Sequence, residues 1–149
     1  MTDHRSPHRR LFIPALGGLY ASAHTGVETL LRVIAGGFLV VHGSTKIINP
    51  FGAAGMVESI GFHPPAFWSL MLSLGEFGGG LLLAIGLLTR PAAAVTTFIL
   101  LVTVYFHWIL QSQGYSGAEK SILWAAVTLF FLIRGGNRHS VDAKIGREF

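Results

Sequence analysis

Long apolar runs separated by short polar segments dominate the hydrophobic pattern of this chain. A transmembrane helix needs about 20 largely apolar residues, and four runs reach or approach that length: 27–47, 66–88, 91–110 and 119–134. The last run is apolar only over 122–133 and therefore needs tilt or snorkelling ends. Lipid offers no hydrogen bonds to the backbone, so each run must be a helix. The pattern predicts an all-α integral membrane four-helix bundle.

The distribution of positive charge predicts the orientation of these helices. Most of the 11 Lys and Arg residues fall on one side of the predicted bundle: Arg5, Arg9, Arg10, Arg90, Arg134, Arg138, Lys144 and Arg147. Lys46 and Lys120 fall on the other side, and Arg32 lies within the first run. The positive-inside rule places the cation-rich side in the cytoplasm. We therefore predict an N-in/C-in, multi-pass protein of the inner (cytoplasmic) membrane.

The segment before the first run admits two interpretations. Arg9-Arg10, an apolar stretch and the small residues 21–23 resemble a signal peptide, with a hint of a twin-arginine signal. Pro14 and two nearby glycines weaken the stretch as an inserting helix and favour an interfacial arm on the inner leaflet. We predict three parts: an N-terminal arm at 1–26, the bundle at 27–134 and a cytoplasmic tail at 135–149.

Composition supports membrane insertion and narrows the chemistry. The chain is 51% hydrophobic and only 12% charged, about half the charged fraction of an ordinary soluble domain. The net charge of +4 can indicate a nucleic-acid partner, but the cations flank apolar runs, so we expect lipid and no nucleic acid as the partner. The absence of cysteine excludes disulfides, thiol redox chemistry and Cys-ligated clusters.

Ionisable side chains within the runs are candidate functional residues, because burying a charge in the membrane costs at least about 2.5–3.5 kcal/mol. With a rise of about 1.5 Å per residue, five polar side chains from the four helices lie about 18 to 24 Å from the cytoplasmic ends of those helices: His42, Glu76, His107, Glu119 and Lys120. Arg32 lies apart, about 7 Å from the inner face. The sequence therefore predicts one polar layer in the outer half of the membrane, with Arg32 outside it.

Glu76 is the sharpest candidate in that layer. His42, His107 or Lys46 are its possible ion-pair partners. A Glu–His pair can accept protons from a quinol as it is oxidised, which makes Glu76, His42 and His107 the catalytic candidates. The same pairing can instead be a structural clasp that fixes helix register, and both interpretations stay open.

The two histidines also suit haem ligation, or metal binding together with Glu76 and Glu119. No His-x-x-x-His or Glu-x-x-His spacing is present, so we prefer hydrogen-bonded interior histidines and predict no metal site. Snorkelling accounts for Glu119 and Lys120, and Trp124 is either packing or the wall of a pocket. The candidate cofactor-binding residues are Arg32, His42, Lys46, Glu76, His107 and Trp124.

Three stretches of the chain carry a family resemblance. They are 31–52, with His42-Gly43-Ser44-Thr45-Lys46; 75–93, with Gly75-Glu76 and Gly79 to Arg90; and the closing Gly135-Gly136-Asn137-Arg138-His139-Ser140-Val141-Asp142. These motifs resemble those of DoxX-type membrane proteins, although the usual proline between the last two glycines is missing. The resemblance implies a four-helix inner-membrane bundle and an association with quinone-linked redox complexes.

Three functions are compatible with these observations. The first is a subunit of a quinone-linked redox complex, in which quinone or a partner chain supplies the redox centre. The second is a non-enzymatic lipid-binding or scaffold protein. The third is a small transporter or channel lined by Glu76, which would need a homo-oligomer because four helices make a thin pathway. Whether the chain is itself an enzyme stays open.

Overall fold

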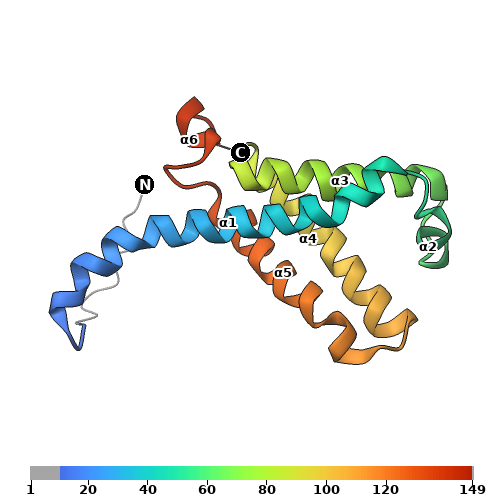
Figure 1. Cartoon of the computed structure of the whole chain (residues 1–149), viewed down its shortest axis with the longest axis horizontal. Coiled ribbons are helices and arrows are strands. Elements are labelled where there is room, and N and C mark those ends of the chain that lie inside the picture. The colour runs from blue at the N-terminus through green and yellow to red at the C-terminus, as the bar shows by residue number, and fades with distance from the viewer. Residues whose placement is uncertain (1–10, 149) are drawn as a thin grey trace.

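The computed structural model describes residues 11–148, and all regular structure within that range is helical. The helices are η1 (Pro14–Leu16), α1 (Gly17–Ile48), α2 (Ala54–Ser59), α3 (Pro65–Ile85), α4 (Thr89–Tyr105), η2 (Phe106–Leu110), α5 (Gly114–Arg134) and α6 (Val141–Ile145) (Figure 1). Four helical segments, formed by η1–α1, α3, α4–η2 and α5, are long and apolar enough to cross a membrane. The all-α, four-span prediction is confirmed, while the N-in/C-in orientation stays a prediction. Arg5, Arg9 and Arg10 lie outside the described residues.

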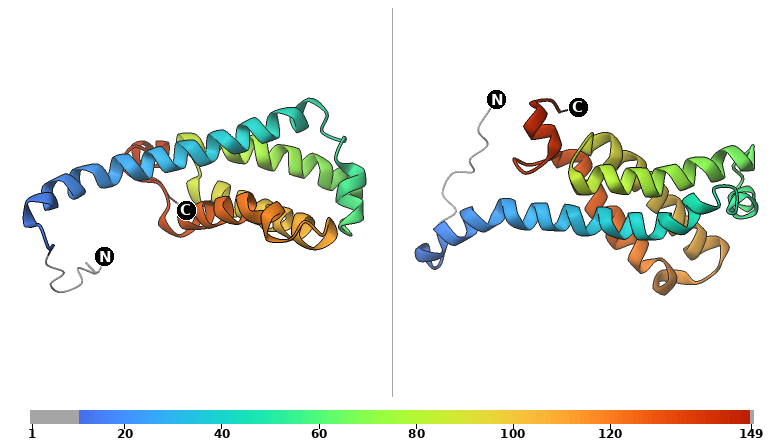
Figure 2. Two further views of the ribbon diagram at one scale, coloured as in Figure 1. Left: turned by 60° about the horizontal axis from the view of Figure 1, so that its bottom comes forward. Right: turned by 45° about the horizontal axis from the view of Figure 1, so that its top comes forward.

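The spanning helices form two pairs. Helix α1 packs mainly along α3, and α4 mainly along α5, with fewer contacts between the pairs. Figures 1 and 2 show α4 and α5 leaving the α1–α3 pair at an angle. Glycines bring α1 close to α3: a Cβ on Gly36 would lie 2.5 Å from the Gly80 oxygen, and one on Gly43 2.5 Å from the Phe77 nitrogen. Small residues therefore determine this contact, as is usual in membranes.

Two spanning helices begin earlier than the apolar pattern indicates. Helix α1 starts at Gly17 rather than at 27, and its 32 residues extend about 48 Å, with the N-terminal end projecting beyond the bundle (Figure 2). Pro14 occupies the first turn of η1, where a missing N–H costs nothing. Helix α5 starts at Gly114 and has 21 residues, so the short-span prediction for 119–134 needs correction. Whether residues 17–26 lie on the inner leaflet stays a prediction.

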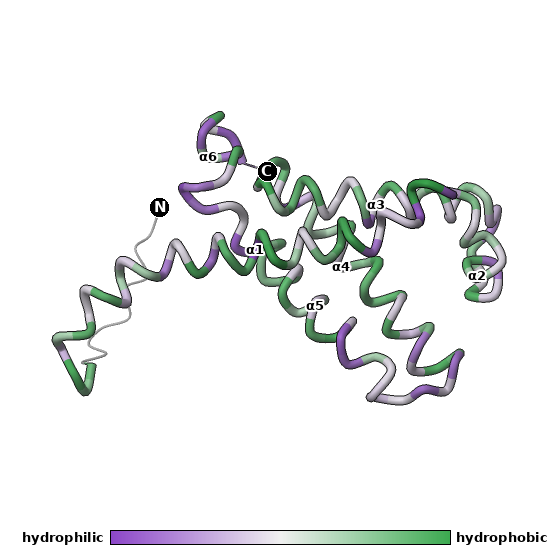
Figure 3. Tube along the Cα trace, viewed as in Figure 1, coloured by the Kyte–Doolittle hydropathy of each residue, from purple (hydrophilic) through white to green (hydrophobic). Residues whose placement is uncertain are grey.

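Apolar side chains cover the outside of the bundle. A small core lies between the helices, formed by Ala35, Leu39, Leu83, Ala92, Ala93, Leu100, Ala125 and Phe131. Large side chains such as Leu30, Val41 and Phe98 are exposed, as expected for surfaces that face lipid. Figure 3 shows hydrophilic residues gathered around α6 and the connection from η2 to α5. The polar groups thus concentrate at the two ends of the bundle.

Candidate ligand site between the helix pairs

A cavity of about 1260 Å³ lies between the two helix pairs. Residues of α1, α2, α3, α4, η2 and α5 line it, and most of them are apolar. Five of the six predicted cofactor-binding residues are among them: His42, Lys46, Glu76, His107 and Trp124. Arg32 is not in the lining. The fold therefore brings four predicted polar side chains from three elements to one apolar cavity.

Glu76 and Lys46 form an ion pair at the cavity wall. The Lys46 ammonium donates to the Glu76 carboxylate over 2.5 Å, joining α3 to α1. The Glu76 side chain is buried and that of Lys46 is partly exposed. Gly43 permits the pair to form, because it lets α1 approach the backbone of α3 beside Glu76. Of the three partners considered for Glu76, the structure selects Lys46.

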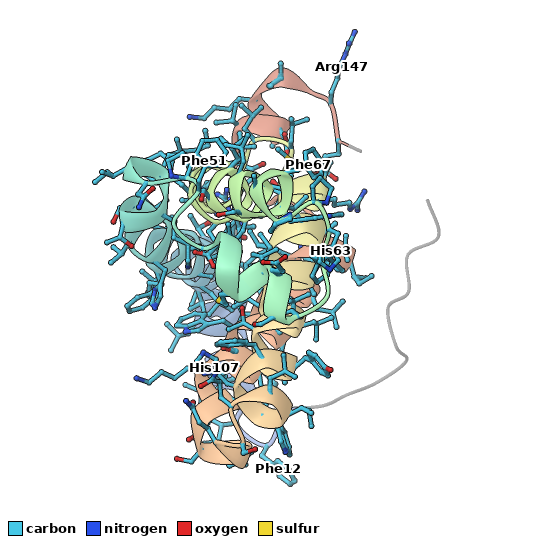
Figure 4. All side chains as sticks on the ribbon, turned by 90° about the vertical axis from the view of Figure 1, so that its right-hand side faces the viewer. Phe12, Phe51, His63, Phe67, His107 and Arg147 are labelled. Atoms are coloured by element: carbon cyan, nitrogen blue, oxygen red, sulfur yellow. The ribbon has the colours of Figure 1, made fainter. Side chains whose placement is uncertain are left out.

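The two cavity histidines have other partners. His42 Nδ1 lies 3.0 Å from the Phe38 carbonyl oxygen, one turn earlier in α1. His107 Nδ1 lies 2.9 Å from Gln113 Oε1. Figure 4 views the molecule from the α2 end, with Phe67 and His107, both in the lining, on opposite sides of α2. The cavity thus presents two imidazoles that are separate from the Lys46–Glu76 pair.

Trp124 forms part of the apolar wall. Its ring packs against Phe38 with ring centroids 5.2 Å apart and a tilt of 43°. Both residues line the cavity, so Trp124 serves both in packing and as part of the wall. Among residues 11–148, no three His, Cys, Asp or Glu side chains lie close enough to hold a metal ion. The polar side chains of the cavity can form hydrogen bonds and exchange protons with a ligand beside a mainly apolar lining.

Comparison with known proteins identifies the family. The family model described as DoxX matches residues 27–108, more than half of the chain. This chain belongs to the DoxX family. It is 26% identical over 120 residues to "Inner membrane protein YqjF" of Escherichia coli, covering 79% of this chain and 91% of the relative. An "Uncharacterized protein" of Haemophilus influenzae is 26% identical over 121 residues, covering 76% and 87%. No solved structure matches. With four candidate spans, this DoxX protein is a multi-pass inner-membrane protein.

Arg32 belongs to a second polar cluster, at the end of the bundle beside α6. Its side chain is 1% exposed, and Nη1 donates to the Leu83 carbonyl over 3.1 Å. The guanidinium lies against Gly86, which has φ of +74° and terminates α3. A side chain at Gly86 would overlap Arg32 and Ser140. The left-handed glycine therefore makes room for a buried cation.

Asp142, which the sequence pattern did not single out as a site residue, is the centre of this second cluster. Its carboxylate accepts hydrogen bonds from the backbone nitrogens of Leu88 (2.7 Å) and Thr89 (2.9 Å) and from Thr89 Oγ1 (2.7 Å). Its own N–H donates to the Gly86 oxygen. Burial raises the pKa of Asp142, but the hydrogen bonds from Thr89 and Leu88 and the charge of Arg32 lower it further, so the net pKa is lowered. Asp142 therefore caps α4 from a distant part of the chain.

Glu28 ties α1 to α5 and the tail at the same end. Arg134 Nε and His24 Nε2 each lie 3.2 Å from its buried carboxylate. Asn137 donates to the Thr25 carbonyl and to Thr29 Oγ1. The closing motif of the sequence contained Asn137 and Asp142, but spacing along the chain gave no sign of which helices they contact.

Proposed function

We propose that this DoxX protein binds a quinone or quinol from the bilayer in the cavity between its helix pairs, as a subunit of a quinone-linked redox complex. The observation that carries the proposal is the cavity itself, an apolar enclosure with an ion pair and two imidazoles on its walls. Ligand sites usually combine a mainly apolar lining with a few placed polar groups. A quinone has the matching composition, since its ring carries polar oxygens and its tail is apolar.

Different cavity residues would contact the ring and the oxygens of the ligand. Phe38 and Trp124 supply an aromatic surface against which a ring can pack. The Lys46–Glu76 pair and the two histidines supply donors and acceptors for the ring oxygens. When a quinol is oxidised, it gives up two electrons and two protons. The side chains can receive the protons, and the electrons pass to a redox partner subunit.

Binding tests this proposal directly. Wild-type protein in lipid nanodiscs should bind a benzoquinone carrying a decyl chain, and protein purified in mild detergent should retain quinone in solvent extracts. Glu76→Gln removes the carboxylate at the cavity wall and should weaken binding by about tenfold, or 1.4 kcal/mol. Glu119→Gln is the matched control, because Glu119 is exposed and lies outside the cavity lining.

The alternative functions are distinct outcomes of the same experiment. Stoichiometric phospholipid in the extract, with no quinone binding, would establish a lipid-binding or scaffold protein instead. Equal quinone binding by Glu76→Gln and wild type would remove Glu76 from the site.

A further inference from the structure

We infer that Gln113 is a positioning residue that sets the tautomer of His107, and that the cavity consequently prefers the hydroquinone form of its ligand. The preference rests on the proposed function, whereas the control of the tautomer does not. His107 Nδ1 and Gln113 Oε1 form a hydrogen bond 2.9 Å long.

An amide oxygen has lone pairs and no proton, so it can only accept. The Nδ1 atom of His107 must therefore donate. In a neutral imidazole that carries its proton on Nδ1, Nε2 is an unprotonated acceptor. His107 thus lines the cavity with one ring nitrogen already engaged and the other able to accept a hydrogen bond.

The local backbone is specialised to bring Gln113 back to His107. Residues Phe106–Leu110 form a π-helix, a wide turn that is rare and often occurs at functional sites. The chain then reverses, with Ser112 at φ of +53° and Gly114 at +62°, and the Gln113 N–H donates to the His107 carbonyl over 3.0 Å. A non-glycine residue in the left-handed region is strained, so the surrounding structure enforces this turn.

Gly117 makes room for the Gln113 side chain. A Cβ at Gly117 would overlap the Gln113 Cβ and lie 2.5 Å from Oε1, closer than real Cβ contacts allow. Any larger residue there must displace the amide that holds His107. Three features, the π-helix, the left-handed turn and Gly117, therefore serve the same hydrogen bond.

His42 adopts the same tautomer, but a backbone carbonyl and not a side-chain amide accepts from its ring. Its Nδ1 lies 3.0 Å from the Phe38 carbonyl oxygen, which also can only accept. Both cavity histidines consequently leave Nε2 as an acceptor. Lys46, which is paired with Glu76, and Lys120 also line the cavity, and their ammonium groups can donate to the oxygens of either a quinone or a hydroquinone. A ligand that donates two hydrogen bonds fits these acceptors, which is the property of a hydroquinone and not of a quinone.

The tautomer is measurable without any ligand. In ¹⁵N-histidine-labelled protein, the His107 signals, assigned by their loss in His107→Gln, should show a protonated Nδ1 and an unprotonated Nε2. Gln113→Leu should abolish that pattern, and Gln113→Glu, which keeps an acceptor oxygen, should preserve it. Gln111→Leu is the control, since Gln111 is an exposed neighbour outside the cavity lining. An unchanged tautomer in Gln113→Leu would overturn the positioning role.

The ligand preference is tested with the decyl benzoquinone and its hydroquinone in nanodiscs. Wild-type protein should bind the hydroquinone about tenfold more tightly, and Gln113→Leu should reduce that ratio to about threefold or less. If Gln113→Leu does not fold, Gly117→Ala displaces the same amide and should give the same loss. Equal affinity for both forms in wild type would overturn the preference while leaving the proposed function standing. Failure of wild type to bind either form would overturn the proposed function instead.

Discussion

The two ends of the bundle use similar polar residues in different ways. At the α6 end, Arg32 and Asp142 are buried and bonded to backbone atoms of other helices. At the α2 end, Lys46 and Glu76 are bonded to each other, and they line a cavity together with two histidines. A polar side chain bonded to fixed backbone holds helices together. One that borders open space remains accessible to a ligand, so burial alone does not distinguish structural from functional charges in a membrane.

The orientation of these two ends gives an all-or-none test. We expect a reporter that is active only in the cytoplasm to give signal when fused at Met1 or Phe149, because the cations gather on the side of the α6 end. The same reporter inserted within 52–64 should give none. Signal from that insertion would reverse the assignment of the two ends.

Removing Asp142 should have the largest effect on stability. Asp142→Ala leaves the start of α4 uncapped and Arg32 without the acidic neighbour that its buried charge faces. Removing one partner from buried charges costs about 3–5 kcal/mol. Thermal unfolding in detergent should show a large drop in the midpoint. Glu148→Ala is the control, since Glu148 is exposed and lies 3.9 Å from Arg90, and surface pairs contribute about 1 kcal/mol or less.

Adding a methyl group at the close contact between α1 and α3 should have the next largest effect on stability. Gly36→Ala places a methyl group 2.5 Å from the Gly80 oxygen and the Ala84 nitrogen, and overpacking of this kind costs about 1–3 kcal/mol. Gly37→Ala, one position along, meets nothing within 4 Å and should be neutral or slightly stabilising. Equal midpoints for the two variants would show that α1 and α3 do not approach as described.

The Lys46–Glu76 ion pair at the α2 end should contribute less to stability. Interhelical hydrogen bonds in membranes are worth about 0.6 kcal/mol on average, and a glutamine at position 76 can still bond to Lys46. Glu76→Gln should therefore lower the unfolding midpoint far less than Asp142→Ala. A comparable loss in both variants would make Glu76 a clasp, the alternative that the sequence left open, and would remove the contrast between the two ends.

Acid should lower the stability of the α6 end in a way that depends on Asp142. Its pKa is lowered by folding, so its contribution is fully present above the unfolded value, about 3.9, and is lost as pH falls through the lower folded value. We expect wild type to lose thermal stability below about pH 4, and Asp142→Asn to lose less over that range. Parallel pH profiles would exclude Asp142 as a contributor.

The sequence predicted what depends on local pattern. Apolar runs gave the four spans, and the rise per residue placed His42, Glu76 and His107 at similar depths, where all three line the cavity. It did not predict which neighbour Glu76 pairs with, because depth fixes height and not rotation about the helix axis. The cap on α4 by Asp142 could not be predicted from the sequence for a related reason. Asp142 and Thr89 are 53 residues apart, and no periodicity links them.

That separation has a consequence for biosynthesis. Thr89 is added to the growing chain roughly 3 to 10 s before Asp142, at elongation rates of about 5–20 residues per second. During this interval Asp142 is not yet present to accept from the first backbone N–H groups of α4 or to lie beside Arg32. Until the acidic residue arrives, lipid headgroups or water must supply those bonds. The nascent protein therefore passes through a stage in which α4 has been synthesised but its cap by Asp142 has not yet formed.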